Sequence, residues 1–500
     1  MIKNYLLVLL LISAVIIGGP FAVCAEVKEI IAEGTYNMGD GETPVTAEEK
    51  ALLAAKRTAL EEAGTYVESY SKVNNFVLTQ DEVQVLAAGI MEVSVLEKKR
   101  TIAGDGFNFR VKIKARINPD SISSMARKVK SREVVDEYNK VKEAYDQSQR
   151  QIDELKKQLI AAKDIKKPDL EKKIASEEKK FQASQWIEKG NSLVAKGDYE
   201  VAISAYTKAI EIDPSSAWAY KNRSWARLEK GLYTEAVRDA GRAIELEAQN
   251  HGAYSNRGVA HRRMRLYEKA IADFNKAVMI NPEVDFYYNN RGNVYFDMRN
   301  YESALADYNR AIALNARYAI AYSNRATVYL HKNMLDQAQN DYNQAIELDP
   351  RDASPYNGRA EVYKRKNEVD KALSDINSAL LLNPRLAEAY NRRGVLNRWK
   401  GNVDAAIADY SSAINIDSRY VDSYNNRAYA YIVRGDFNKA IADATKAVAL
   451  DPGYANAYVN RGRAYVKLGK MAAAGKDFSQ ACSLGNNDGC QELKAVRKLK

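Results

Sequence analysis

A short phrase that returns at multiples of 34 residues constrains this chain more than any other feature. It begins at Tyr288 as Tyr-Asn-Asn-Arg-Gly, and closely similar phrases begin at Tyr322 and Tyr424. A period of this length is typical of stacked helical hairpins, because one hairpin alone cannot bury its apolar faces. Nine units of 34 residues fit between residues 183 and 488 without an insertion, and they begin at Ala183, Ala217, His251, Asp285, Ala319, Ala353, Ala387, Val421 and Ala455.

Large and small residues alternate inside the unit in a fixed order. Positions 4, 11 and 24 favour aromatic residues, positions 8, 20 and 27 favour small ones, and proline closes several units at position 32. Small residues let neighbouring helices approach closely, and aromatic rings fill the remaining gaps. The pattern resembles the tetratricopeptide repeat family. That resemblance implies a mainly α fold, a right-handed α–α superhelix, in which a concave groove binds a protein or peptide.

Two charged positions recur together in eight of the nine units. The first unit has Lys189 and Ala205 there, so it lacks both the arginine and the aspartate. This coincidence predicts structural ion pairs, either within one hairpin or between adjacent hairpins. The alternative is an anion-binding row of arginines, which the matching aspartates disfavour. Position 7 and position 23 hold Arg223 and Asp239, Arg257 and Asp273, Arg291 and Asp307, Arg325 and Asp341, Arg359 and Asp375, Arg393 and Asp409, Arg427 and Asp443, and Arg461 and Asp477.

A row of asparagines is the candidate for holding a peptide. Positions 2, 5, 6, 9, 12 and 13 share one face of the first helix, and Trp225 and Trp399 also fall on it. A carboxamide both donates and accepts hydrogen bonds, so such a row can hold a peptide backbone. It resembles the asparagine ladder of O-linked N-acetylglucosamine transferases; the alternative is a polar filler on a solvated surface. Gly358 and Arg392 interrupt the row, which holds Asn222, Asn256, Asn290, Asn324, Asn426 and Asn460.

The N-terminus has the pattern of an export signal. Lys3 precedes an apolar run from Leu6 to Ile17, and small residues lead to a cleavage point after Ala25. The alternative is a lipoprotein signal with lipid on Cys24, which would attach the protein peripherally to a membrane. Residues 1–25 are therefore predicted to be a signal peptide, and the mature protein to be periplasmic or associated with the outer membrane.

Residues 26–120 predict a small α+β domain. Val27–Tyr36, Ile90–Thr101 and Phe107–Ile117 have the character of strands, and a helix rich in alanine and leucine is expected from Ala47 to about Ser71, with a shorter one around 81–88. The phrase from Ala54 to Ser69 resembles the N-terminal module of flagellar T-ring assembly proteins and a family of small outer-membrane lipoproteins. This resemblance implies a packing or assembly role in the envelope; the alternative is a generic α+β domain.

Residues 121–182 predict a helical coiled-coil spacer. Lys167-Pro168 breaks the helix before a second apolar run that leads into the array. The two runs could form an antiparallel hairpin, the first could pair with a second copy of the chain, or the helix could be a solvated spacer. The seam at 134–162 steps by four and three through Val134, Tyr138, Val141, Tyr145, Ser148, Ile152, Leu155, Leu159 and Ala162.

Cysteine and histidine are too sparse for most catalytic or metal chemistry. Three of each occur, and none has metal-site or nucleophile–base spacing. In an oxidising compartment Cys482 and Cys490 are expected to join, just before a capping helix and basic tail at 489–500; the alternative is two buried thiols. The formal charge of +10 mixes both signs through the array, which disfavours a nucleic-acid groove.

Together these features predict a non-enzymatic, exported scaffold that binds a protein or extended peptide, without cofactor or metal. The alternative is a structural subunit of an envelope or appendage assembly that forms oligomers through the spacer at 134–162.

Overall fold

The computed structural model describes residues 27–38, 44–73, 83, 86–87, 90–103, 106–118, 143, 147–148, 150–159 and 167–498. The chain divides into two compact units, Met1–Leu266 and Tyr267–Lys500, so the boundary falls between the two helices of the third repeat. The predicted signal peptide and most of the predicted seam at 134–162 and of the short helix around 81–88 lie outside the described residues.

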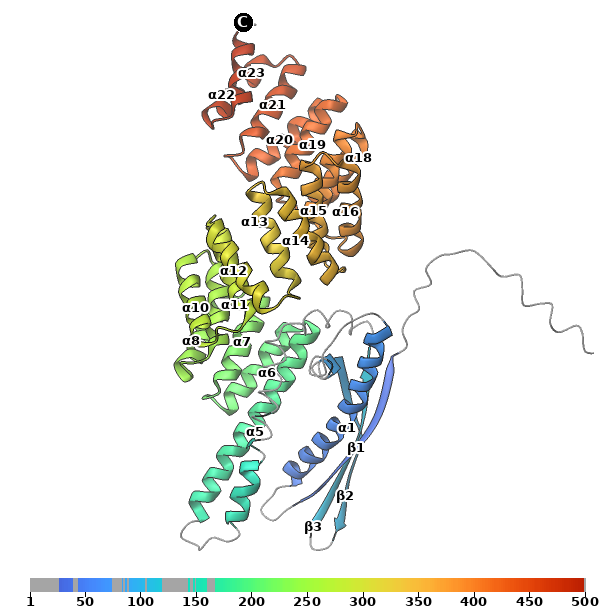
Figure 1. The fold of residues 1–500 in the computed structure, drawn as a ribbon, viewed down its shortest axis with the longest axis vertical. Coiled ribbons are helices and arrows are strands. Elements are labelled where there is room, and N and C mark those ends of the chain that lie inside the picture. Colours follow the sequence, from blue (N-terminus) through green and yellow to red (C-terminus); the bar gives the residue numbers. More distant parts are fainter. Residues whose placement is uncertain are drawn as a thin grey trace, which may run out of the picture. The chain divides into compact units, whose positions relative to one another are not determined.

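A three-stranded antiparallel sheet with one long helix on it forms the start of the first unit (Figure 1). The sheet order is β1 (Lys28–Asn37), β3 (Gly106–Ile117), β2 (Met91–Ala103), and α1 (Pro44–Val73) packs on β1 and β3. Alanines at every fourth residue of α1, from Ala47 to Ala63, are fully buried. A Cβ on Gly34 would lie 2.2 Å from the Ala51 carbonyl oxygen, so glycine is what lets α1 sit so close to β1.

The described part of the predicted spacer contacts the helix that opens the array. This helix, α5 (Lys167–Lys196), includes the first helix of repeat one. Ile152 and Phe181 share a small apolar cluster, and Lys156 Nζ lies 3.5 Å from Glu178 Oε1. Lys167-Pro168, predicted to stop a helix, stands at the first turn of α5, where proline needs no amide hydrogen bond.

Helical hairpins with the predicted 34-residue period fill the rest of both units (Figure 1). The first unit continues with α6 (Tyr199–Ile212), α7 (Ala217–Glu229), α8 (Tyr233–Leu246) and α9 (His251–Arg263). The second unit contains α10 (Tyr267–Ile280), α11 (Asp285–Asp297), α12 (Tyr301–Leu314), α13 (Ala319–His331), α14 (Leu335–Leu348), α15 (Ala353–Arg365), α16 (Val369–Leu382), α17 (Ala387–Trp399), α18 (Val403–Ile416), α19 (Val421–Arg434), α20 (Phe437–Leu450), α21 (Ala455–Lys467), α22 (Met471–Ser483) and α23 (Asn487–Lys498).

The repeat positions have the packing roles that their residue types predict. Alanines at positions 20 and 27, such as Ala304 and Ala311, are fully buried between helices. Within each unit, every helix of the array packs on the next, and first helices also contact the first helix of the following repeat. The residue at position 15 has a positive φ and turns the chain between the two helices; it is Gly197, Gly231, Arg265, Arg299, Asn333, Asn367, Gly401, Gly435 and Gly469. The array is therefore a solenoid of helical hairpins, as predicted.

Candidate functional site

The candidate site is the inner face, which we define as positions 2, 5, 6, 9, 12 and 13 of the first helices. A row of ion pairs joins these helices to the second helices of their hairpins. In each described pair, Nε and Nη2 of the arginine donate to the aspartate carboxylate of the same hairpin at 2.7 to 3.2 Å. The aspartate side chains are only 4 to 11% exposed. Seven predicted pairs have this geometry: 223–239, 291–307, 325–341, 359–375, 393–409, 427–443 and 461–477. The eighth, Arg257 and Asp273, straddles the unit boundary.

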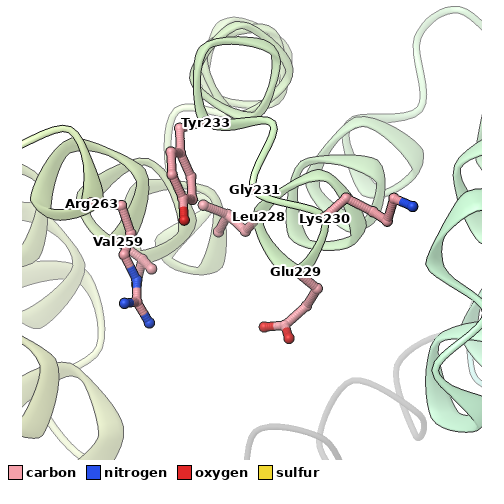
Figure 2. A pocket seen from close by; sticks show the side chains of 7 residues that line it. All are labelled: Leu228, Glu229, Lys230, Gly231, Tyr233, Val259 and Arg263. Carbon is pink, nitrogen blue, oxygen red and sulfur yellow. The ribbon is translucent and has the colours of Figure 1, made fainter. Parts of the chain in front are cut away.

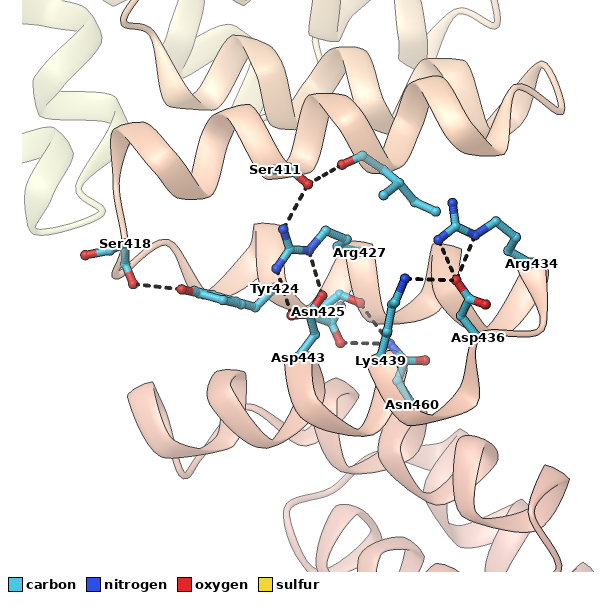
Figure 3. A network of polar contacts seen from close by, with 11 residues as sticks. Ser411, Ser418, Tyr424, Asn425, Arg427, Arg434, Asp436, Lys439, Asp443 and Asn460 are labelled. Atoms are coloured by element: carbon cyan, nitrogen blue, oxygen red, sulfur yellow. Dashed lines mark hydrogen bonds and ion pairs between the residues drawn. The ribbon is translucent and has the colours of Figure 1, made fainter.

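Each of these arginines also reaches the preceding repeat. Its Nη1 donates at 2.6 to 3.2 Å to the polar residue at position 25 of that repeat. In Figure 3, Arg427 lies between Ser411 of one hairpin and Asp443 of its own. The guanidinium carbon also lies 5.3 to 5.8 Å from the ring centre of the tyrosine at position 4. One arginine therefore joins three helices, both within a hairpin and between hairpins.

This geometry favours a structural role for the row of arginines over an anion-binding role. All three nitrogens of each guanidinium already donate a hydrogen bond inside the protein, which uses three of its five N–H groups. The hydrogen bond to Asp307 raises the pKa of Arg291 in spite of its partial burial. In the seven described pairs the arginine charge is therefore matched by a buried aspartate, which supports the structural role over anion binding.

The asparagine row requires a correction. Asn222, Asn256, Asn290 and Asn460 are buried, with at most 9% of each residue exposed. The side-chain amide groups of five of the six donate to the first helix of the preceding repeat: Asn222 to Asn191 Oδ1, Asn256 to the Lys221 carbonyl, Asn324 to Asn289 Oδ1, Asn426 to Asn391 Oδ1 and Asn460 to Asn425 Oδ1, at 2.8 to 3.0 Å.

The row therefore holds the repeats to one another, as Figure 3 shows for Asn460 and Asn425. The physical reason is that position 6 faces the preceding hairpin as much as the groove. Five of the six amide groups are therefore engaged between repeats, and the buried amide nitrogen of Asn290 has no hydrogen-bond partner among the described residues.

The interruption of the row by Gly358 and Arg392 creates a charged cluster. Arg392 Nη1 donates to Glu361 Oε2 at 2.5 Å, and Glu361 also pairs with Lys364 at 2.7 Å and Arg365 at 3.3 Å. Burial alone would raise the pKa of Glu361, but the hydrogen bond from Lys364 and the Arg392 charge outweigh it and lower the pKa. This part of the inner face is electrostatically satisfied.

The tyrosine at position 24 usually bonds to the residue at position 9 of its own repeat. Tyr206 donates to Asn191 Oδ1 at 2.6 Å, and Tyr308 donates to Asn293 Oδ1 at 2.8 Å. In repeat seven position 9 is Val395, and the hydroxyl of fully buried Tyr410 has no hydrogen-bond partner among the described residues. Burial raises the pKa of Tyr410 to about 12, so the hydroxyl keeps its proton.

This difference predicts opposite effects of one substitution at two equivalent sites. Tyr308→Phe should lower the free energy of unfolding by about 0.5–1.5 kcal/mol, because it deletes a hydrogen bond. Tyr410→Phe should raise it by about 1 kcal/mol, because it removes a buried, unpaired hydroxyl. Urea unfolding followed by circular dichroism would compare them, and a loss of stability in Tyr410→Phe would contradict the assignment.

The two predicted tryptophan contacts differ in their accessibility. Trp225 is partly buried and packs on an apolar cluster with Leu228, Ala236 and Ala260. Trp399 is 50% exposed at position 13. Beside it in the chain, the guanidinium carbon of Arg398 lies 4.8 Å from the ring centre of Tyr429 in the next repeat. Of the two, Trp399 is therefore the residue available to a partner.

A pocket in the first unit contributes little recognition chemistry. It holds about 360 Å³ and is lined by Leu228, Glu229, Lys230, Gly231, Tyr233, Val259 and Arg263 (Figure 2). Its lining comes from the ends of helices and the turn after α7.

In the described residues, no group of three or more His, Cys, Asp or Glu side chains could hold a metal ion. None of the described helices is long and apolar enough to cross a membrane.

A disulfide fastens the helix that covers the last repeat. Cys482 and Cys490 are joined with their Cα atoms 4.6 Å apart, at the start of α23. Arg463 of the inner face also donates to Glu492 at 2.8 Å and to Asp488 at 3.2 Å. The exposed apolar side of a terminal repeat needs such a cover.

Loss of this disulfide should loosen the cap. Replacing both cysteines with serine is expected to lower the local stability of α23 by about 2–3 kcal/mol, the chain-entropy value for so small a loop. Hydrogen exchange would show faster exchange of α23 amides, with α13 amides as the internal control. Unchanged exchange in α23 would contradict the prediction.

Comparison with known proteins agrees with the repeat geometry. Residues 252–284, 286–318, 319–352 and 421–454 match the tetratricopeptide repeat family, residues 455–488 match a second family of that description, and residues 190–223 and 398–433 match a TPR repeat family. No curated protein matches the chain in sequence.

Similar folds occur among solved structures. They include the APC/C hetero-tetramer Cut9–Hcn1, at 14% identity and a TM-score of 0.47, covering 63% of this chain and 76% of that one. A tetratricopeptide repeat protein from Parabacteroides merdae is 23% identical, with a TM-score of 0.41 and coverage of 49% and 97%. YrrB, described as a TPR protein with an unusual peptide-binding site, is 25% identical, with a TM-score of 0.30 and coverage of 37% and 95%. The helical array of this chain is therefore built from tetratricopeptide repeats.

Proposed function

We propose that this chain is a non-enzymatic scaffold that binds an extended peptide or protein segment on the inner face of its array. The observation that carries the proposal is a separation of roles along the first helices. Positions 6 and 7 are used in contacts between repeats, whereas Trp399 and Val433 at position 13 are 50% and 53% exposed. An aromatic and charged lining of this kind suits a protein partner.

Selection of peptides on the full chain would test this proposal. Linear random peptides would be selected, and the best one titrated calorimetrically against wild type and a variant with Trp399→Ala and Val433→Asp. We expect at least about tenfold weaker binding, the cost of losing one buried interface anchor. The matched control is Leu381→Asp, because Leu381 is 84% exposed on a second helix. Failure of selection, or equal loss with Leu381→Asp, would contradict binding on the inner face.

We also propose that the scaffold acts outside the cytoplasm. The support is the signal-like sequence of residues 1–25. The intact mass of the mature protein should correspond to a chain beginning at Glu26. A lipid-modified chain beginning at Cys24 would instead establish membrane attachment, and a chain that keeps Met1 or residues 2–25 would contradict export.

A structural subunit of an envelope assembly is the second candidate. The resemblance of residues 26–120 to flagellar T-ring assembly modules and the seam at 134–162 support it, and both stay predictions. In the described residues, Ile152 and Lys156 contact α5 of the same chain. Light scattering of the full chain after size exclusion would decide, since a strict monomer contradicts self-assembly through the seam.

A further inference from the structure

Repeat seven contains a buried tyrosine hydroxyl without a hydrogen-bond partner, unlike the other described repeats with tyrosine at position 24. Wherever another described repeat places tyrosine at position 24, position 9 supplies a polar partner: Asn191, Asn293 and Thr327 for Tyr206, Tyr308 and Tyr342. Repeat nine has Phe478 at position 24 and needs no partner. Tyr410 alone among these keeps its hydroxyl opposite an apolar residue, Val395, with which it shares a cluster.

The arginine beside this hydroxyl also stands apart. Within the described residues of the second unit, four arginines occupy positions 6, 9, 12 or 13 of the inner face: Arg365, Arg392, Arg398 and Arg463. Three of them pair with carboxylates. Arg398 is half-buried, lies against the Tyr429 ring, and has no carboxylate within 4.0 Å among the described residues. A guanidinium in this state retains N–H donors for an external acceptor.

Exposed apolar side chains stand next to this arginine in the chain and at the same position of the following repeat. Trp399 follows Arg398 in the same helix, and Val433 holds the equivalent position in the next repeat. Trp399 is the only tryptophan of the second unit. A ligand that satisfies Arg398 can therefore also cover exposed aromatic and aliphatic surface.

We propose that Arg398, with Trp399 and Tyr429, forms a subsite for one carboxylate of a bound peptide and for the apolar side chain next to it. This inference rests on the proposed function and names the chemistry of one part of that site. The guanidinium donates to the carboxylate oxygens, the Tyr429 ring supports its planar face, and Trp399 covers the neighbouring apolar group.

Tyr410 acts in this subsite as a positioning residue. The Arg398 guanidinium opposes the burial that raises the pKa of this hydroxyl, which places the two groups close together, and the hydroxyl has no hydrogen-bond partner among the described residues by geometry. The hydroxyl oxygen can accept from one guanidinium N–H when the outward N–H groups turn to the ligand. In the complex, the hydroxyl would then be paired as well as the carboxylate.

The carboxylate could be an internal aspartate or glutamate or the free C-terminus of the partner. Two random heptapeptide libraries on one carrier, displayed internally or with a free C-terminus, would be selected on the full-length protein. We expect internal Asp or Glu beside an apolar residue to be enriched in the first case, or a free terminus to be required in the second. The best peptide would then be synthesised and titrated calorimetrically.

Arg398→Met should lower the affinity for this peptide by at least about tenfold, as expected for the loss of hydrogen bonds to a charged group. The matched control is Arg419→Met, an exposed loop arginine of the same repeat. Replacing the peptide carboxylate with an amide should weaken binding to the wild-type protein as much as Arg398→Met does. The same replacement should leave the affinity of the Arg398→Met variant unchanged. Tyr410→Phe should weaken binding several-fold without lowering stability, which a purely structural role would not produce.

The outcomes separate this subsite from the function on which it rests. Successful selection without acidic or terminal preference, and with equal affinity for Arg398→Met, would overturn the subsite and leave the scaffold function standing. Selection of no peptide at all would overturn both. Equal losses with Arg398→Met and Arg419→Met would show a non-specific charge effect and overturn the subsite.

Discussion

Asp307→Ala is expected to lower the free energy of unfolding of the array by about 3–5 kcal/mol, the usual effect of removing one partner of a buried ion pair. Asp307 accepts from Nε and Nη2 of Arg291 at 2.8 and 2.7 Å, and its side chain is 8% exposed. Alanine would leave Arg291 with Asn275 as its remaining side-chain hydrogen-bond acceptor among the described residues, at 2.6 Å. The cost arises because the remaining charge stays buried without its counter-charge.

Replacing both partners should be much less harmful. Asp307→Leu combined with Arg291→Met removes the two charges together, and such apolar replacements of buried pairs are often nearly neutral. Urea unfolding of the full chain would compare the single and double variants. Asp436→Ala is the control, because its ion pair with Arg434 is exposed to solvent and should contribute little to stability. A double variant as unstable as Asp307→Ala would refute the pairing argument.

Gly462→Ala should destabilise the last repeat by about 1–3 kcal/mol through overpacking. Gly462 is at position 8, and a Cβ there would lie 2.5 Å from Cε1 of the buried Phe478 ring. Atoms cannot approach so closely, and the ring is held between α21 and α22. The methyl group must therefore push apart the two helices or tilt the ring.

The same substitution at Gly475, thirteen residues later, should increase stability rather than lower it. A Cβ at Gly475 in α22 would meet only Val496 Cγ1, at 4.0 Å, and alanine is favoured over glycine in a helix by about 1 kcal/mol. Thermal unfolding of both variants would test this contrast. Adding Phe478→Leu should recover part of the loss in Gly462→Ala. If Gly462→Ala were as stable as Gly475→Ala, close helix contact at position 8 would not explain the glycine.

Much of the architecture could be predicted because it repeats. The hairpin occurs nine times, and residues that are present by chance differ between copies. Positions 8, 20 and 27 keep small residues in most copies, which identified them as close contacts. The first unit has Lys189 and Ala205, and this joint absence of the arginine and the aspartate pointed to the ion pairs. In the N-terminal domain, alternation predicted β1 and β3 nearly to the residue, and an alanine-rich segment predicted α1.

The asparagine row shows where the same reasoning failed. Position 6 lies on the correct side of its helix, but helical spacing cannot say how near the preceding repeat approaches that side. In the fold, the acceptor for Asn460 is Asn425, 35 residues earlier. Tyr410 was missed for a related reason. A signal was available, since tyrosine at position 24 accompanies Asn or Thr at position 9 in Tyr206, Tyr308 and Tyr342.

The sequence by itself determined the repeat, its register and the partners of most ion pairs, because these depend on residue types at fixed spacing. Only the tertiary structure decided which polar groups are already satisfied. Whether a polar group is hydrogen-bonded depends on distances between neighbouring hairpins, and these distances cannot be deduced from the sequence of one helix. The same distances bury most of the asparagines against the previous repeat, while on the inner face of repeat seven Trp399 stays exposed and Arg398 is left without a carboxylate partner among the described residues.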